Sequence, residues 1–277
     1  MIFVCCGPAT GLVQVFHFCY LIERLDRMNT AIERLPFTVG IATERDLQAV
    51  AKLRSMTYGR HLPGLGAKLR EPEAADFEAG CQVILAKSKL DGEVLGTLRT
   101  HANIHKPLPL QASIDLPDTL TDSLMVETTR LSILGSPNSS LVRCALFKAL
   151  YTYCIEQKVD WMLAAGRNPV DRIYDGLLFE DVMEKGAYYP MSHAAGLPHR
   201  VMKLSPSAAR SKWAAQGHPL YSFMVETQHP DITLAGAGKL RQAARVPTRH
   251  IETRTLLSPI QDGIRRFASM GMQLQVA

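Results

Sequence analysis

The sequence predicts an α/β (α+β) domain in which helices flank a mixed central sheet and the fourth strand is bulged and splayed from its neighbour. Helical and extended patterns alternate over residues 37–231, which is typical of a sheet covered by helices. The Asp91-Gly92 pair separates two apolar runs and indicates a hairpin. An apolar, β-branched strand then carries two charges, Glu127 and Arg130, and leads through a Gly/Pro/Ser/Asn turn into a long helix.

The composition sets the class of protein. The chain has 277 residues, 47% hydrophobic and 21% charged, which are ordinary values for a globular protein. A net charge of +5, spread along the chain, gives no reason to expect a nucleic-acid partner. Its six cysteines include no C-x-x-C pair and stand beside no H-x-x-x-H spacing, which argues against a zinc site or a disulfide framework. We therefore expect no bound metal and a cytoplasmic location.

The two ends of the chain are expected to be extensions, over residues 1–36 and 232–277. The first 22 residues are apolar, but Gly and Pro interrupt them and no basic segment precedes them, so they match neither a membrane span nor a signal peptide. Two interpretations stay open: a peripheral membrane anchor, or a start of translation at Met28.

The first strand is expected at residues 37–42, and Thr43 starts a helix because its spacing to Asp46 is close to a capping box. Arg54 falls on or beside the apolar stripe of that helix. It is either an arginine that snorkels to water or a buried arginine that needs an acidic partner.

Residues 61–79 form a polar, acidic connection, either a solvated loop or a lid that presents a carboxylate to a substrate. The hairpin strands follow at residues 82–87 and 93–102. Gly96 leaves one face of the second strand without a side chain at that position, so another segment of the chain is expected to pack closely there. Arg99, late in this strand, would by itself be interpreted as exposed.

The strand that carries Glu127 and Arg130 follows a long excursion over residues 104–122. Strict alternation would send the two charges to opposite faces, whereas a β-bulge between them would bring both to one face and splay the strand. Ser139 and Ser140, with Asn138 before them, are good cap residues for the helix expected at 141–159, whose N-terminus suits a phosphate.

The remaining elements are short. They are a strand at 161–166, a helix from Asn168-Pro169 to about Leu178, strands at 188–191 and 199–204, and a helix from Ser205 through Ala215.

This order of elements resembles the GNAT acyltransferase fold. The run Glu127-Thr-Thr-Arg130-Leu131 resembles the E-x-x-R-[FL] signature of acyl-homoserine-lactone synthases and of their relatives, the N-acyl amino acid synthases. The resemblance implies an enzyme that transfers an acyl group from a thioester to an amine.

Further motifs carry the same resemblance. Arg54 and Tyr58 are similar to an arginine–aromatic pair on the families' first helix, Asp76 to their lid acid, and the strand that ends in Arg99 to their G-x-x-R strand. The segments closer to the N-acyl amino acid synthases are residues 161–172, 199–200, 218–220 and 229–231.

Two departures bear on the substrates. A Gly-Ser-Pro-Asn-Ser run from Gly135 stands where CoA-dependent acetyltransferases carry the Q/R-x-x-G-x-G/A loop that cradles the pyrophosphate. A phosphopantetheine arm has one phosphate and does not need a loop that cradles a pyrophosphate. The resemblance therefore implies an acyl carrier protein as donor and partner. No tryptophan near residues 54–69 matches that of the homoserine-lactone synthases, which favours an N-acyl amino acid as product. The alternatives are a homoserine-lactone synthase, a CoA-dependent GNAT enzyme and a noncatalytic acyl-binding regulatory module.

Attack of an amine on a thioester needs a proton acceptor, positioning and donors for the oxyanion. Glu127 is the candidate base, with a pKa that burial would raise. Arg130 and Arg99 are candidates for the α-carboxylate of the amino acid, and Arg54 with Asp76 for closing the lid. The alternative for Glu127 and Arg130 is a structural salt bridge inside the sheet.

The thioester is expected as a co-substrate and not as a bound cofactor. Its pantetheine arm would enter the splay, beside Leu131, Ile133, Ser139 and Ser140. Candidates for the acyl tunnel are Leu146, Leu150, Tyr153 and Leu163. Candidates for a basic surface facing the carrier protein, or for solvated helix faces, are Arg143, Lys148, Arg167 and Arg172.

Overall fold

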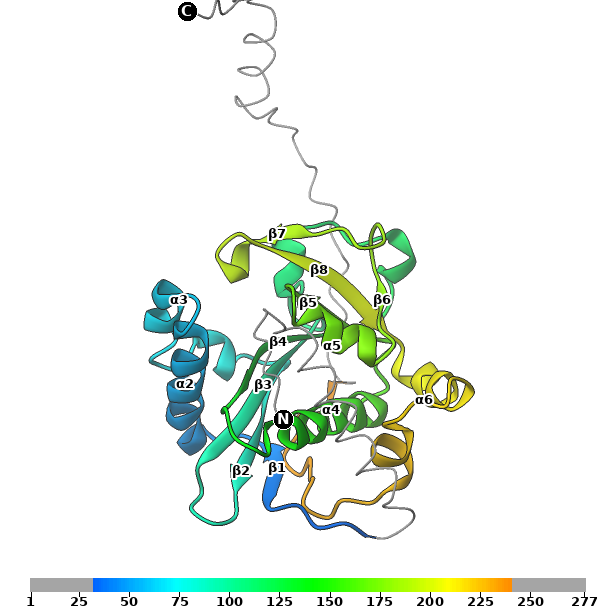
Figure 1. Cartoon of the computed structure of the whole chain (residues 1–277). Coiled ribbons are helices and arrows are strands. Elements are labelled where there is room, and N and C mark those ends of the chain that lie inside the picture. Colours follow the sequence, from blue (N-terminus) through cyan, green and yellow to red (C-terminus); the bar gives the residue numbers. More distant parts are fainter. Residues whose placement is uncertain (1–31, 241–277) are drawn as a thin grey trace, which may run out of the picture.

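The computed structural model describes residues 32–240, which form a sheet covered by helices on both faces (Figure 1). The strand order is β1-β2-β3-β4-β5-β8-β6, with β7 paired to β8 outside this path. The strands are β1 (Phe37–Ile41), β2 (Cys81–Ser88), β3 (Val94–Ala102), β4 (Met125–Ile133), β5 (Trp161–Gly166), β6 (Glu180–Asp181), β7 (Tyr189–Met191) and β8 (Leu197–Leu204). All neighbouring pairs are antiparallel except β4 and β5, so the sheet is mixed as predicted.

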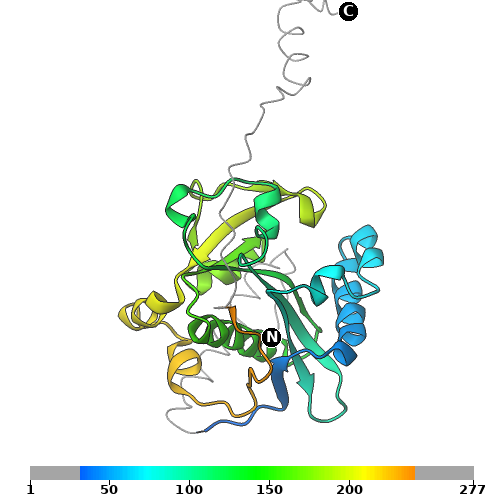
Figure 2. The same ribbon diagram turned by 180° about the vertical axis from the view of Figure 1, so that it is seen from behind.

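The helices are α2 (Glu44–Gly59), α3 (Pro63–Lys68), α4 (Ser139–Glu156), α5 (Asp171–Gly176) and α6 (Pro206–Ala215). Short 3-10 turns and a π turn complete the described residues: η1 (Ala74–Phe77), η2 (Pro109–Ala112), η3 (Asp118–Leu120), η4 (Ser192–Ala194) and η5 (Ser222–Glu226). Figures 1 and 2, seen from opposite sides, agree that α2 and α3 lie together at one side of the molecule and α6 at the other.

Alternation along β2 separates the two faces of the sheet. Val83 and Leu85 pack with the apolar stripe of α2, whereas Ile84 and Ala86 belong to the larger core that α4 fills. The two helices therefore cover opposite faces of the sheet, and β3 and β4 have one side toward each.

Strand β4 is bulged and parts from β5, as predicted. Against β3, Thr97 pairs with Ser132 but Arg99 pairs with Thr129, so β4 has one extra residue at the bulge. Arg130 takes a φ of 55°, in the left-handed region. Against β5, pairing runs from Met125 only to Thr128. Beyond that residue the two strands separate.

Gly96 brings α4 close to β3, which confirms the expected close packing. A Cβ placed there would lie 2.7 Å from Val142 Cγ1 and 3.0 Å from Leu146 Cδ1. This contact fixes the N-terminal half of α4 beside the bulge.

Most predicted elements are confirmed within one or two residues, including the Asp-Gly hairpin and α6. Three expectations differ. The helix expected at 141–159 spans Ser139–Glu156 and so ends three residues earlier. The helix expected from Asn168 begins only at Asp171, because residues 168–170 form a turn in which the Asp171 N–H is bonded to the Arg167 carbonyl. The connection over residues 61–79 contains α3 and η1.

Of the predicted extensions at the two chain ends, residues 1–31 and 241–277 lie outside the described residues. Residues 232–240 pack against the domain: the Thr233 N–H donates to the Val39 carbonyl, and the Leu240 N–H to Gln157 Oε1. Both interpretations of the N-terminus concern residues beyond the described range. None of the helices among residues 32–240 is both long and apolar enough to cross a membrane.

Candidate active site

A pocket of about 70 Å³ lies where β4 parts from β5. Residues from β4, the end of β5, the α2–α3 corner and the turn between β7 and β8 meet there. They are Tyr58, Leu62, Leu65, Thr128, Thr129, Arg130, Ala165, Arg167, His193, Ala194, Leu197 and His199. Where β4 and β5 separate, the hydrogen bonds between the strands give way to this pocket, which has both apolar and cationic sides.

Glu127 lies 3.8 Å from His193, one of the residues that line this pocket, and its side chain is 0% exposed. Its Oε2 accepts the Leu110 N–H at 2.9 Å, while its Oε1 is buried without a hydrogen-bond partner among the described residues. Burial raises the pKa of Glu127 to about 8, against a smaller lowering by the Leu110 N–H, Arg99 and Arg130. A carboxyl group with these properties ionises near neutral pH, as a general base requires.

His193 of η4 faces the free oxygen of Glu127. Its Nε2 lies 3.8 Å from Glu127 Oε1, and its side chain is 21% exposed. Burial and the nearby charge of Arg130 lower the pKa of His193 to about 4. The ring is therefore neutral at physiological pH.

Arg130 pairs with Glu73, and no ion pair joins Arg130 to Glu127. Its Nε and Nη2 donate to the two carboxylate oxygens of Glu73 at 2.8 and 2.7 Å. The bulge brings Arg130 to the face that carries Glu127, as predicted, but the alternative of a structural Glu127–Arg130 salt bridge is wrong. Hydrogen bonds from Arg130 and the charges of Arg99 and Arg54 lower the pKa of Glu73 to about 2, outweighing its burial.

Arg54 is buried with an acidic partner, so the snorkelling interpretation is wrong. Its Nη1 donates to both oxygens of Asp76 at 2.8 and 2.9 Å, and both side chains are 1% exposed. Arg99 is also buried: its Nη1 donates to Glu73 at 3.0 Å and to Asp76 at 3.1 Å. Three arginines and two carboxylates therefore form one network, which we call the ionic cluster (Arg54, Glu73, Asp76, Arg99 and Arg130).

Sequence reasoning missed Glu73 and His193 as individual residues. Glu73 carries a readable local signal, since its N–H is capped by Asp76 three residues later. That signal predicts a turn but does not say which arginine the Glu73 carboxylate meets. His193 follows Glu127 by 66 residues and sits in a single 3-10 turn, so only the tertiary fold brings the two together.

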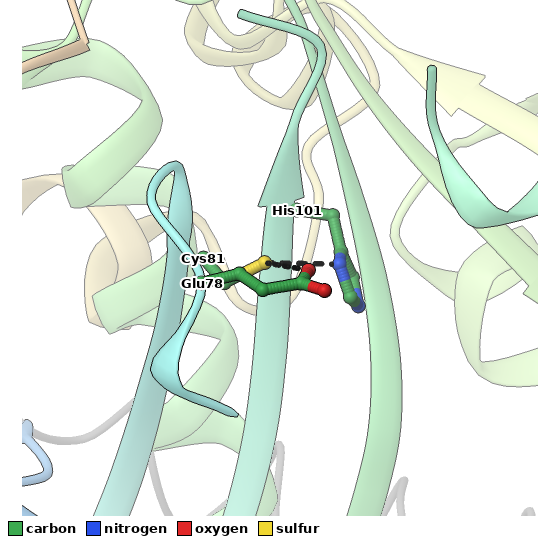
Figure 3. A group of neighbouring side chains, drawn as sticks. All are labelled: Glu78, Cys81 and His101. Carbon is green, nitrogen blue, oxygen red and sulfur yellow. Dashed lines mark hydrogen bonds between the residues drawn. The ribbon is translucent and has the colours of Figure 1, made fainter. Parts of the chain in front are cut away.

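Beside the ionic cluster, Glu78, Cys81 and His101 lie with their ligand-type atoms within 4.8 Å of one another. Figure 3 shows the Cys81 sulfur directed at both the Glu78 carboxylate and the His101 ring. Arg99 Nε donates to His101 Nε2 at 3.0 Å, and a guanidinium is always a donor. The ring proton therefore lies on Nδ1, 3.1 Å from Cys81 Sγ, and occupies the lone pair that a metal would need.

The other predicted residues are placed as follows. The Tyr58 ring lies 6.0 Å from the Arg130 guanidinium carbon. Leu131 and Ile133 are half-buried against the α4 core, and Ser139 and Ser140 begin α4.

Two expectations are corrected. Lys148 is buried, not on a basic surface: its ammonium group donates to the backbone carbonyls of Phe223 and Thr227. The four candidate tunnel residues do not line one cavity. Leu146, Leu150 and Tyr153 fill the core under α4, while Leu163 belongs to a separate core cluster with Leu108 and Leu110.

The other three residues predicted to form a basic surface lie in different environments. Arg143 is bonded to Ser140 at 3.2 Å, Arg167 lines the pocket, and Arg172 is exposed.

Comparison with known proteins finds the fold but no family by sequence. No protein-family model and no curated protein matches the chain. The structure is similar to FeeM, an N-acyl amino acid synthase from uncultured soil microbes, with a TM-score of 0.50 and 14% identity over 68% of this chain and 98% of FeeM. It is also similar to BjaI, a CoA-dependent acyl-homoserine lactone synthase with SAM and isopentyl-CoA, with a TM-score of 0.51 and 14% identity over 73% of this chain and 95% of BjaI. The predicted GNAT acyltransferase fold is confirmed.

Proposed function

We propose that this protein is an acyltransferase that moves an acyl group from a phosphopantetheine thioester to the α-amine of an amino acid and so makes an N-acyl amino acid. The observation that carries the proposal is the parting of β4 from β5, which opens a pocket directly beside a buried carboxyl group of raised pKa. A purely structural acid at this position would be paired, as Glu73 is, whereas Glu127 keeps one oxygen free.

The pocket supplies distinct surfaces for the two substrates. Leu62, Leu65 and Leu197 give it an apolar side, against which the start of the acyl chain would lie. Arg167 lines it without an ion pair to any described residue, and with Arg130 Nη1 it would hold the α-carboxylate. In this proposal Arg99 has a supporting role, because its donors are turned to Glu73, Asp76 and His101.

The pantetheine arm would pass through the gap beyond Thr128. Backbone N–H groups of β4 near Leu131 and Ile133 would face the thioester oxygen, and the first turn of α4, at Ser139 and Ser140, would receive the single phosphate. An acyl carrier protein is proposed as donor, since the run from Gly135 offers one helix N-terminus and no glycine-rich pyrophosphate cradle.

The reaction needs no covalent intermediate on the protein. The ammonium group loses a proton to the Glu127 side of the pocket, and the free amine attacks the thioester carbon. Collapse of the tetrahedral intermediate breaks the C–S bond, and the nitrogen loses a second proton. One of the two protons ends on the leaving thiol, and the other is released to solvent.

The test uses the full chain with an acyl donor and an equimolar mixture of amino acids, followed by mass spectrometry of the products and by measurement of released thiol. Acyl carrier protein and CoA carrying the same acyl group are run in parallel, and one arm replaces the amino acids with S-adenosylmethionine. We expect N-acyl amino acid from the carrier-protein arm. A lactone product, or a strong preference for CoA, would establish the corresponding alternative.

Glu127→Gln is the matched variant, because the glutamine carbonyl can still accept the Leu110 N–H. We expect turnover to fall by about 10²–10⁴-fold while acyl-carrier binding is kept. A folded wild-type chain that binds the acyl carrier protein but gives no product in any arm would overturn the enzymatic proposal and favour an acyl-binding module.

A further inference from the structure

Glu127 does not itself line the pocket, and this leaves the path of the substrate proton open. The pocket wall in front of the acid is His193, whose side chain is partly exposed while Glu127 is fully buried. We infer that His193 meets the substrate amine and takes its proton at Nε2, and that the ionised Glu127 carboxylate forms an ion pair with the resulting imidazolium. The inference rests on the proposed function for the identity of the amine, but the His193–Glu127 pair stands on the geometry alone.

The separation of the two groups supports this role. Nε2 and Oε1 lie 3.8 Å apart, which is too far for a direct hydrogen bond and close enough for an ion pair. Oε1 is also the oxygen left without a partner, since Oε2 accepts the Leu110 N–H. The free oxygen of Glu127, Oε1, therefore lies within ion-pair distance of the ring of His193, which lines the pocket.

One short segment holds both partners. The 3-10 turn η2 supplies the Leu110 N–H to Glu127, and the segment that follows it holds η4 through Ser113, whose Oγ accepts the Ser192 N–H at 2.9 Å and lies 3.0 Å from Ser192 Oγ. Arg130 Nη1 reaches the His193 carbonyl at 3.5 Å. The acid and the imidazole are thus fixed relative to each other by backbone contacts.

The charges around His193 explain why the acid is needed. Burial and the charges of Arg130, His199 and Arg99 lower the pKa of His193. Ionised Glu127, whose Oε1 lies 3.8 Å from Nε2, would in this proposal supply the opposing negative charge. The ring can accept a proton from an ammonium group only when Glu127 is a carboxylate, so the two act as one unit that binds a single proton.

The step is a proton transfer and leaves both residues unchanged over a cycle. The N–H bond of the ammonium group breaks, a proton bonds to Nε2, and the amine keeps the electron pair with which it attacks the thioester carbon. The imidazolium then returns a proton to the leaving thiolate sulfur.

The first experiment compares His193→Ala and His193→Gln with wild type and with His105→Gln, a variant of an exposed histidine. We expect kcat to fall by about 10²–10⁴-fold in both His193 variants with KM for the acyl donor unchanged, and added imidazole to restore at least about tenfold in His193→Ala. His105→Gln should keep wild-type activity. Unchanged kcat, or a loss in His193→Ala that imidazole does not relieve, would overturn the inference.

The second experiment reads the pair without any turnover. NMR of the His193 ring nitrogens is followed against pH in wild type and in Glu127→Gln, and a step that reports ionisation of Glu127 should appear only in wild type. Absence of that step overturns the inference. A step in a chain that acylates no amine would retain the His193–Glu127 pair and reject the acyltransferase proposal, so the two failures are distinguishable.

Discussion

Strands β3 and β4 have an apolar face toward α4 and a charged face toward α2, and the two faces are built on different principles. On the α4 face, Gly96, Leu98 and Val126 pack against the helix, and the buried Thr100 lies among them. On the α2 face, buried Arg99 belongs to the ionic cluster, and buried Glu127 lies on the same face. The shape of the side chains determines which residues are accommodated on the face toward α4, and the pairing of charges determines this on the face toward α2.

The charged face also contains a contrast between two carboxylates. Glu73 is bonded to two arginines, and its pKa falls to about 2. Glu127 is deeper, has one backbone donor, and its pKa rises to about 8. The same side chain is therefore a permanent anion in one place and a proton acceptor near neutral pH in the other, because one has arginine partners and the other does not.

The largest expected effect comes from breaking the ionic cluster at its most buried acid. Asp76→Ala removes the carboxylate that is hydrogen-bonded to Arg54 and one of the two partners of Arg99, and it leaves the buried Arg54 guanidinium with only the longer 3.9 Å ion pair to Glu73. We expect the free energy of unfolding to fall by about 3–5 kcal/mol, measured by urea denaturation.

The control for Asp76→Ala is Glu180→Ala, which removes a largely exposed partner of Lys212. We expect that change to cost about 1 kcal/mol or less. If Asp76→Ala and Glu180→Ala lowered the free energy of unfolding by similar amounts, the ionic cluster would contribute no more to stability than exposed ion pairs do.

The contrast between the two carboxylates predicts opposite dependences of stability on pH. Glu127 has a folded pKa raised above its ordinary value, so its contribution to stability is complete below about pH 4.5 and is lost as pH rises through about 8. Glu127→Gln cannot ionise, and its stability relative to wild type should rise by about 2–4 kcal/mol between pH 5 and 9. Parallel stability curves for the two proteins, from urea denaturation at each pH, would mean that Glu127 ionises normally.

For Glu73 the sign is reversed. Its folded pKa is lowered to about 2, so its contribution is present above about pH 4.5 and is lost as pH falls toward 2. Wild type should lose about 2–3 kcal/mol more than Glu73→Gln over that interval, because the variant has no such carboxylate to protonate. Acid titration followed by circular dichroism at fixed urea measures the difference, and equal losses would show that Glu73 is not held by the arginines.

Local patterns were sufficient for the Asp91-Gly92 hairpin turn and for the close packing at Gly96, which are signals within a few residues. The bulge follows from the resemblance, because strict alternation alone would send Glu127 and Arg130 to opposite faces. The pairing on the charged face depends on side chains from distant segments, so the sequence left Arg54 either snorkelling to water or paired with an acid, and it did not predict that Arg130 pairs with Glu73. Lys148 was misplaced for the same reason: the carbonyls of Phe223 and Thr227 that bind it come from the other end of the domain.

The smallest expected effect tests the apolar face. Gly96→Ala places a methyl group 2.7 Å from Val142 Cγ1 and 3.0 Å from Ile133 Cδ1, so α4 or the bulged end of β4 must shift. We expect the free energy of unfolding, measured by urea denaturation, to fall by about 1–3 kcal/mol.

Gly64→Ala is the matched control, since a Cβ there meets nothing within 4 Å and an alanine favours helix α3. Its free energy of unfolding should be unchanged or rise by up to about 1 kcal/mol. Because Ile133 belongs to the strand that parts from β5, Gly96→Ala should also lower acyl transfer, whereas a destabilised variant with full activity would show that α4 packing and the pocket are independent.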